Sequence, residues 1–272
     1  NNSFVFQNHY SYYNGGGSTF NSEFAVNTGF ITPLSYTQNA YSFNKNSFPY
    51  SMANMFKNQD YVVNAFHMNS GEYYSRQTNY TNWGYDKYYG LLDINDYKDK
   101  SYTLDRELIN DVTFQEKMFP KDSKFVDYLI TYSNHLPFTN TKGVCKLLYD
   151  MEMDLDDTVD TGEESSSMFV QLTEEECIRK QAHETDYMME LLLKKLTELN
   201  LIDDTVIVVF TDHYLYTVED KTILDKYKNT SNNLINKTPF FIWQNNMKRT
   251  NIKEVTSQLN ILPTTLNLFG IN

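Results

Sequence analysis

The feature that most constrains the fold is a long amphipathic helix followed by a short, wholly apolar segment. Residues 173–199 carry apolar side chains at helical spacing, and Thr173 with Glu176 forms a capping box at their start. Residues 204–210 then predict a strand that is buried on both faces, as strands in parallel sheets are. A helix that leads into such a strand favours an α/β fold.

Other segments extend this alternation. We expect three further strands, at residues 61–66, 125–132 and 238–243. Two more helices are expected, at residues 105–118 and 254–269. Asp105 is the predicted N-cap of the first, and the second is expected to be interrupted near Pro263. Residues 1–47 have weak periodicity and indicate loops around one short helix. The sequence thus predicts a mostly parallel central sheet with helices on both faces.

Composition excludes some functions. The net charge is -12 and the chain has no basic patch, which argues against a nucleic-acid partner. No apolar run reaches the roughly 18 residues that a membrane span needs.

Cys145 and Cys177 lack metal-ligand spacing, and they are either two buried thiols or a disulfide. The acidic residues 152–167 predict a mobile surface loop.

Three predicted strands end on polar residues that can carry chemistry. These residues are His67, the pair Asn134-His135 and the pair Asp212-His213. Ligands of open α/β sheets bind beyond the carboxyl ends of the strands. A carboxylate beside an imidazole suits a divalent cation, so Asp212 and His213 are candidate metal ligands. The alternative is a capping Asp beside a surface His.

Two other segments have the character of a phosphate site. Residues 15–17 are glycines, and the Thr19 hydroxyl follows them at a predicted helix start, where backbone N–H groups favour an anion. The alternative is a flexible loop with a capping hydroxyl. Arg76 follows a run of aromatic residues and can clamp a phosphate through two hydrogen bonds. The alternative is a solvated arginine on a surface helix.

Taken in order, these segments resemble the lipoteichoic acid synthase family, which consists of membrane-anchored phosphoglycerol transferases of the sulfatase and alkaline-phosphatase-like superfamily. The matching segments are residues 4–8, 19–24, 67–76, 83–86, 133–139, 211–214, 261–264 and 268–271. The resemblance implies one sulfatase-like catalytic domain over residues 1–272, lacking the first strand of the family's sheet.

The resemblance also assigns roles to single residues. It implies that Thr19 is the catalytic nucleophile and contacts the metal, with Asp212 and His213 as metal ligands. The metal is expected to be manganese, with magnesium or zinc as substitutes. His135 would protonate the leaving group or bind a phosphate oxygen. The expected phosphoglycerol pocket consists of His67, Asn69, Tyr74, Arg76 and His135.

The implied reaction has two steps. The Thr19 hydroxyl attacks the phosphorus of a phosphatidylglycerol-like lipid, and diacylglycerol leaves. The glycerophosphate group then passes to a polyglycerolphosphate or glycolipid acceptor. The resemblance further implies a monomeric domain at the outer face of the cell membrane, held there by a transmembrane region outside this chain.

Several departures from the family keep other functions open. The family's first metal ligand is a Glu at the end of an upstream strand, and no acidic residue precedes Thr19 here. Asn69 stands where the family usually has Asp, Tyr74 where it has Trp, and Leu215 where it has Gly. A sulfatase-like phosphodiesterase or hydrolase, or a non-catalytic paralogue that binds an anionic glycolipid, remains an alternative. Neither Ser18 nor Thr19 begins the Cys/Ser-x-Pro-x-Arg motif of true sulfatases.

Overall fold

The computed structural model describes residues 2–11, 18–32, 39–94, 102–157 and 169–271. Its strands are β1 (Ser3–Tyr10), β2 (Tyr61–His67), β3 (Lys87–Tyr89), β4 (Lys124–Ile130), β5 (Ile207–Phe210), β6 (Phe240–Trp243) and β7 (Thr250–Ser257). Its α-helices are α1 (Ser18–Thr28), α2 (Met52–Lys57), α3 (Arg76–Asn82), α4 (Arg106–Asn110), α5 (Val112–Met118), α6 (Gly143–Asp157), α7 (Glu174–Glu198), α8 (Lys221–Tyr227) and α9 (Ile261–Leu268). The 3-10 helices are η1 (Ala40–Phe43), η2 (Tyr73–Ser75), η3 (Leu91–Asp93), η4 (Ser231–Asn236) and η5 (Gln258–Asn260).

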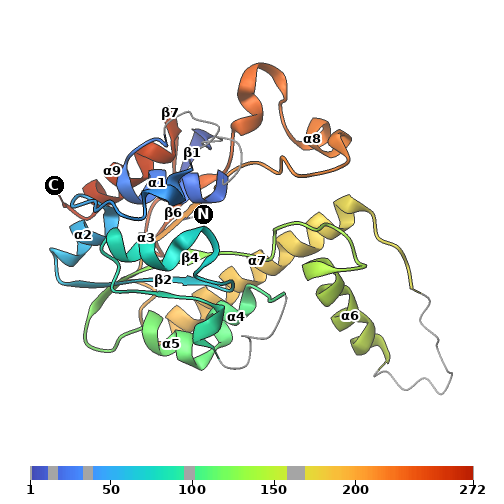
Figure 1. The fold of residues 1–272 in the computed structure, drawn as a ribbon, viewed down its shortest axis with the longest axis horizontal. Coiled ribbons are helices and arrows are strands. Elements are labelled where there is room, and N and C mark those ends of the chain that lie inside the picture. Colours follow the sequence, from blue (N-terminus) through green and yellow to red (C-terminus); the bar gives the residue numbers. More distant parts are fainter. Residues whose placement is uncertain (1, 12–17, 33–38, 95–101, 158–168, 272) are drawn as a thin grey trace.

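The strands form two ladders in an α/β arrangement (Figure 1). One has the order β3-β2-β4 and is parallel throughout. The other has the order β5-β6-β1-β7, in which β1 and β7 are parallel and β6 runs antiparallel to both β1 and β5. The predicted mostly parallel sheet is confirmed, with an antiparallel portion around β6. The prediction that residues 204–210 lie buried in a parallel environment is wrong, because β5 is antiparallel and only half-buried.

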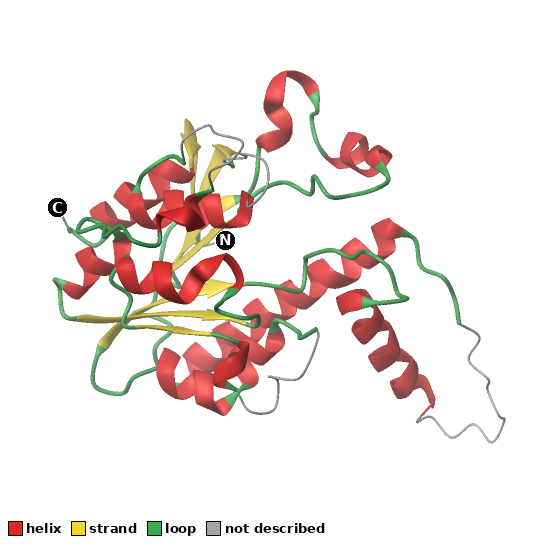
Figure 2. Ribbon diagram, in the orientation of Figure 1, coloured by secondary structure: helices red, strands yellow, loops and turns green. Residues whose placement is uncertain are grey.

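Helices cover both faces of the β2 region (Figure 2). Val63 and Ala65 contribute to a core shared with α1, α2 and α9, whereas Phe66 contributes to a core shared with α4, α5 and α7. Successive side chains of a strand point to opposite faces, so this division places the two cores on the two sides of β2. The predicted helices on both faces are confirmed.

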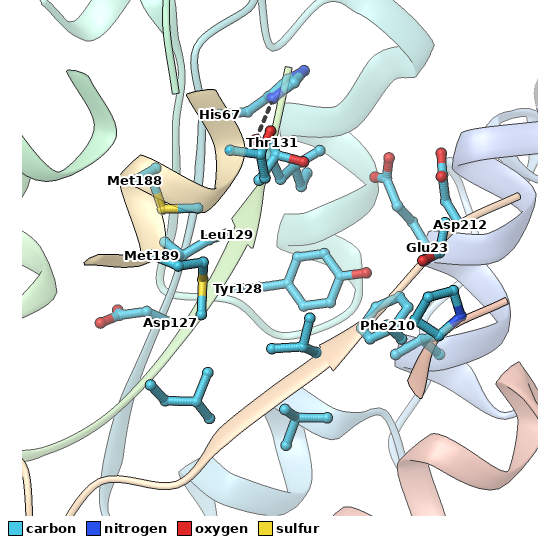
Figure 3. A pocket seen from close by; sticks show the side chains of 18 of the residues that line it. Glu23, His67, Asp127, Tyr128, Leu129, Thr131, Met188, Met189, Phe210 and Asp212 are labelled. Carbon is cyan, nitrogen blue, oxygen red and sulfur yellow. Dashed lines mark hydrogen bonds between the residues drawn. The ribbon is translucent and has the colours of Figure 1, made fainter. Parts of the chain in front are cut away.

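A cavity of about 1350 Å³ separates the two ladders. Consecutive residues of β4 and of β5 line it, and Figure 3 shows Tyr128 and Phe210 pointing into it from these two strands. Among the described residues, β4 pairs only with β2 and β5 only with β6. Both strands therefore present one backbone edge to the cavity.

The N-terminal region corrects one prediction. Residues 3–10, expected to be loop, form β1 between β6 and β7. The pairing of β1 with β7 shifts register between Phe6 and Asn8, and the buried side chains are Phe6 and His9. A bulge changes which residues face the core, so the period of two that marks a strand is lost.

Two predicted helices also differ from the structure. Residues 105–118 form α4 and α5, separated at Asp111, whose side chain caps α5 by accepting the Phe114 N–H. Residues 254–269 form the end of β7, then η5 and α9. Pro263 does not interrupt α9, because it lies in the first turn, where a backbone N–H has no partner within the helix. The predicted helix 173–199 is confirmed as α7, with its Thr173–Glu176 capping box.

The acidic segment is partly helical. Residues 152–157 belong to α6, and residues 158–167 lie outside the described residues. Within the described part of the chain, no helix is both long enough and apolar enough to cross a membrane.

Cys145 and Cys177 form a disulfide that joins α6 to α7. The alternative of two free thiols is therefore wrong. Both residues are fully buried, in a cluster with Phe138, Val218 and Ile223. The bond closes a loop over a sequence separation of 32 residues, which restricts the unfolded chain.

Replacing both cysteines with alanine is expected to lower the free energy of unfolding by about 3–4 kcal/mol, from the entropy of closing a loop of this length. Urea unfolding without reductant measures the change. Adding reductant should weaken the wild-type protein by a similar amount and leave the double variant unchanged. Equal unfolding midpoints for the wild-type protein and the double variant would contradict the expectation.

Candidate active site

Three predicted site residues meet where α1 begins and β5 ends. Thr19 lies in the first turn of α1, and Asp212 and His213 follow the end of β5 after one intervening residue. Thr19 Oγ1 lies 3.2 Å from His213 Nε2, and Asp212 Oδ2 lies 3.1 Å from the same nitrogen. The structure thus brings together a hydroxyl, an imidazole nitrogen and a carboxylate oxygen that were expected at one metal site.

The hydrogen bonds of His213 indicate its tautomer. Nδ1 lies 2.8 Å from the carbonyl oxygen of Tyr214, and a carbonyl only accepts, so Nδ1 carries a proton and donates it. In the neutral ring, Nε2 then presents a lone pair toward Asp212 Oδ2. A cation between a carboxylate oxygen and an imidazole lone pair stabilises such an arrangement, and the Thr19 hydroxyl lies within reach of the same point. The donor set at this point therefore fits a divalent metal ion.

The backbone around Asp212 is fixed by other elements. The Asp212 carbonyl oxygen accepts the Ser22 hydroxyl of α1 at 2.6 Å and the Gln258 side-chain amide of η5 at 2.7 Å. Asp212 Oδ1 accepts the backbone N–H of His213 at 2.8 Å. These bonds tie the metal-ligand turn to the helix that carries Thr19, so the three groups keep their relative positions.

A buried ion pair lies one helical turn beyond Thr19. Arg76 donates through Nε to both Glu23 oxygens and through Nη2 to Oε1 at 2.6 Å, and the Tyr80 hydroxyl donates to Oε2 at 2.9 Å. Burial alone lowers the pKa of Arg76, but the Glu23 charge more than offsets this and raises it. The pair joins α1 to the start of α3 and was not predicted, although Glu23 follows Thr19 at i+4 on the same helix face.

Arg76 therefore differs in its contacts from the isolated phosphate clamp expected from the sequence. Nε and one N–H of Nη2 are directed at Glu23, so Nη1 is the side of the guanidinium that this carboxylate leaves for a phosphate. Arg76 and Glu23 both line the cavity, as Thr19 does. Glu23 and Asp212 lie on the same side of it in Figure 3.

His67 ends β2 and is buried in the cavity wall. Burial, followed by the charge of Arg76, holds the pKa of His67 well below its usual value, so the ring is neutral. Nδ1 lies 2.8 Å from the Ile130 carbonyl oxygen and must donate to it, a bond drawn dashed in Figure 3. Nε2 is then an acceptor, which suits a substrate hydroxyl better than a phosphate oxygen.

The other predicted pocket residues line the same cavity. His135 is exposed, its ring lies parallel to that of Tyr132, and its Nδ1 lies 3.0 Å from the Leu136 carbonyl oxygen. Asn69 accepts the Ser70 N–H through its side chain. Tyr74 and Ser75 both have positive φ values, 59° and 49°, immediately before Arg76. Non-glycine residues in this conformation are uncommon and cluster at functional sites.

The glycines at 15–17 lie outside the described residues. Their predicted role beside the Thr19 hydroxyl therefore stays a prediction. Among the described residues, no group of three His, Cys, Asp or Glu side chains could hold a metal ion. The candidate centre thus depends on the Thr19 hydroxyl as its third ligand.

A family model described as sulfatase matches residues 1–271. The chain belongs to the sulfatase family. Among its relatives is lipoteichoic acid synthase of Staphylococcus saprophyticus, 24% identical over 274 residues, which cover 95% of this chain and 38% of the relative. The sulfatase-family chain spans about two fifths of the length of the curated relatives it matches. The resemblance to the lipoteichoic acid synthase family is confirmed.

Solved sulfatase-like structures share the fold. The lipoteichoic acid synthase LtaP from Listeria monocytogenes superposes with a TM-score of 0.76 at 22% identity, covering 100% of this chain and 64% of LtaP. Streptococcus pyogenes phosphoglycerol transferase GacH, solved with sn-glycerol-1-phosphate, superposes with a TM-score of 0.60 at 17% identity, covering 98% of this chain and 64% of GacH. These matches support the predicted sulfatase-like fold.

Proposed function

We propose that this chain is the catalytic part of a metal-dependent phosphoglycerol transferase with Thr19 as nucleophile. The observation that carries the proposal is the meeting of Thr19 Oγ1, His213 Nε2 and Asp212 Oδ2, with 3.2 and 3.1 Å between neighbouring atoms. Lipoteichoic acid synthases and a phosphoglycerol transferase among the similar proteins support this reaction class.

The proposed transfer of the glycerophosphate group has two steps. Thr19 Oγ attacks the phosphorus of a phosphatidylglycerol-like lipid, and the bond from phosphorus to the diacylglycerol oxygen breaks. His135 Nδ1 is directed at the Leu136 carbonyl oxygen, so Nε2 must first take up a proton before it can donate one to the diacylglycerol oxygen, and the proton that the Thr19 hydroxyl loses in the attack balances this transfer. An acceptor hydroxyl of a polyglycerolphosphate or glycolipid then attacks the phosphothreonine and restores Thr19. When water is the acceptor, the same steps give a phosphodiesterase.

A divalent cation would be held by Thr19, Asp212 and His213. Oxygen ligands with one imidazole suit manganese, and magnesium or zinc can substitute. When bound, the cation lowers the pKa of the Thr19 hydroxyl and neutralises phosphate charge.

The glycerol end of the substrate is expected beside His67. Its neutral ring offers the Nε2 lone pair to a glycerol hydroxyl, and the Nη1 edge of Arg76 offers a cation to the phosphate. Tyr74 and Asn69 line the same cavity. The Cys145–Cys177 disulfide favours an oxidising compartment, which agrees with a monomeric domain acting at the outer membrane face.

Metal binding can be tested by thermal unfolding with MnCl₂. At ten times its Kd, Mn²⁺ is expected to stabilise the chain by about 1.4 kcal/mol, which raises the Tm by roughly 3–6 °C. Asp212→Asn should abolish this shift because it removes a charged ligand. Asp225→Asn, a change at an exposed site on α8, is the matched control and should keep the shift. An undiminished shift in Asp212→Asn would contradict the proposed metal site.

One observation favours the non-catalytic alternative, in which the fold binds an anionic glycolipid. The described residues supply only one carboxylate and one imidazole at the candidate metal centre. The two functions predict different effects of substitutions at Thr19, since a binding domain does not need the Thr19 hydroxyl for chemistry. The measurement that separates them is turnover by variants of that residue.

A further inference from the structure

The turn that carries His135 is held by side chains from two helices. After β4 ends at Ile130, the His135 N–H donates to the Tyr132 carbonyl oxygen at 3.1 Å and closes a turn over residues 132–135. The His135 side chain is exposed, and its ring stacks on that of Tyr132 in the same turn. Its position at the cavity is therefore set by whatever fixes the turn's backbone.

Asp105 binds backbone groups in the first half of this turn. Its Oδ1 accepts the backbone N–H groups of Tyr132 at 2.6 Å and Ser133 at 3.1 Å. Its Oδ2 accepts the Thr185 hydroxyl of α7 at 2.7 Å, and its own N–H donates to the Ser133 hydroxyl at 2.8 Å. Asp105 does occupy the predicted N-cap position of α4, but its side chain makes no capping hydrogen bond to that helix.

Gln181 binds the second half. This α7 residue donates through Nε2 to the carbonyl oxygens of Ser133 at 2.7 Å and His135 at 2.8 Å. Asp105 and Gln181 are both fully buried, at 0% exposure. Together, two buried side chains bind two N–H and two C=O groups within four residues of backbone.

Surface turns usually satisfy such groups with water, which requires no buried charge. Here burial raises the pKa of Asp105 to about 6, despite the three hydrogen bonds it accepts, so its charged form is costly. The nearby Glu184 adds to the cost, although Arg106 binds it through the backbone N–H and Nε, each at 3.0 Å. The arrangement fixes the turn's position more tightly than solvation would.

We propose that Asp105 and Gln181 are positioning residues that hold the 132–135 turn so that His135 reaches the substrate phosphate. The inference rests on the proposed function, in which His135 acts at the Thr19 site. Neither residue touches the reacting atoms, and both act through His135. Fixing a catalytic group within about 1 Å can be worth around 100-fold in rate.

The test is a double-mutant cycle on the full-length protein with fluorescent phosphatidylglycerol in detergent micelles. His135→Ala is expected to lower kcat/KM by about 100-fold. Asp105→Ala and Gln181→Leu are each expected to lower it by about tenfold in the wild-type background. In the His135→Ala background, both should have almost no further effect, because residues that act through one group are not additive.

Asp105→Asn is the conservative variant. Its Oδ1 still accepts both turn N–H groups, and its amide can donate to the Thr185 hydroxyl, so kcat/KM should stay within about threefold of wild type. A purely structural role would lower the Tm without this dependence on His135. If Asp105→Ala does not fold, Gln181→Leu alone completes the cycle, since it removes two hydrogen bonds and no buried charge.

The outcomes separate the two ideas. Additive losses in the His135→Ala background overturn the positioning role and leave the proposed function standing. Unchanged turnover by His135→Ala overturns the role of His135 and the positioning inference with it. The proposal is supported if Asp105→Ala or Gln181→Leu lowers kcat/KM in the wild-type background and has almost no effect in the His135→Ala background.

Discussion

Thr19→Val is expected to lower phosphatidylglycerol turnover by the full-length protein by at least about 1,000-fold. Valine keeps the shape of threonine but has no hydroxyl, so the covalent intermediate cannot form. Removing a nucleophile typically costs several orders of magnitude in kcat. The Thr19 hydroxyl lies 3.2 Å from His213 Nε2, where the proposed metal ion would activate it.

Two comparisons make this result specific. Thr19→Ser keeps the hydroxyl and should retain measurable turnover, with a phosphoserine in place of the phosphothreonine. Thr222→Val, at an exposed position on α8, is the matched control and should behave as wild type. Turnover that survives in Thr19→Val would show that the catalytic assignment is wrong. Hydrolysis of sulfate esters without turnover of phospholipid would instead overturn the substrate assignment.

Arg76→Met is expected to lower the free energy of unfolding by about 3–5 kcal/mol, because it leaves the Glu23 carboxylate buried without its cation. The side chains of Arg76 and Glu23 are only 3% and 4% exposed, so water cannot replace the lost contacts. The Tm should fall by roughly 10 °C or more. Urea unfolding followed by circular dichroism measures the change.

The double variant Glu23→Gln/Arg76→Met should recover much of this loss, because it removes the unpaired buried charge. Arg179→Met is the matched control. It breaks the Arg179–Glu175 pair, in which Arg179 is 60% exposed, and should lower the stability far less than Arg76→Met because water screens and replaces the contact. If Arg76→Met costs no more than Arg179→Met, the buried pair is not what fixes α1 against α3.

The sequence predicts those elements whose periodicity is undisturbed. β2 and α7 agree with the predicted residues to within one or two positions, because apolar period and capping residues both mark them. Residues 254–257 at the end of β7 were predicted as helix because β7 is an edge strand with exposed Lys253 and Glu254, which leaves no alternating apolar pattern. The break between α4 and α5 follows from the capping side chain of Asp111, which composition alone does not distinguish from a surface acid.

At the site too, some features could be predicted from the sequence and others could not. The strand end alone marked Asp212 and His213 as candidate ligands. The resemblance to the lipoteichoic acid synthase family is what placed Thr19 at the same site. The Glu23–Arg76 pair could not be predicted, since its partners are 53 residues apart. Asp105 was predicted as a helix cap because its position before α4 gives the expected local pattern, while its actual partners lie on a distant turn and on α7.

The two strand edges that face the cavity have a consequence for the protein in concentrated solution. A sheet edge with unpaired N–H and C=O groups is a template on which a strand from another molecule can add. β4 carries the exposed Lys124, whose charge opposes such addition, whereas β5 is the uncharged sequence Ile207–Phe210. The net charge of -12 keeps copies apart at low ionic strength, and salt screens that repulsion. Self-association of this chain should therefore increase with salt and begin at β5.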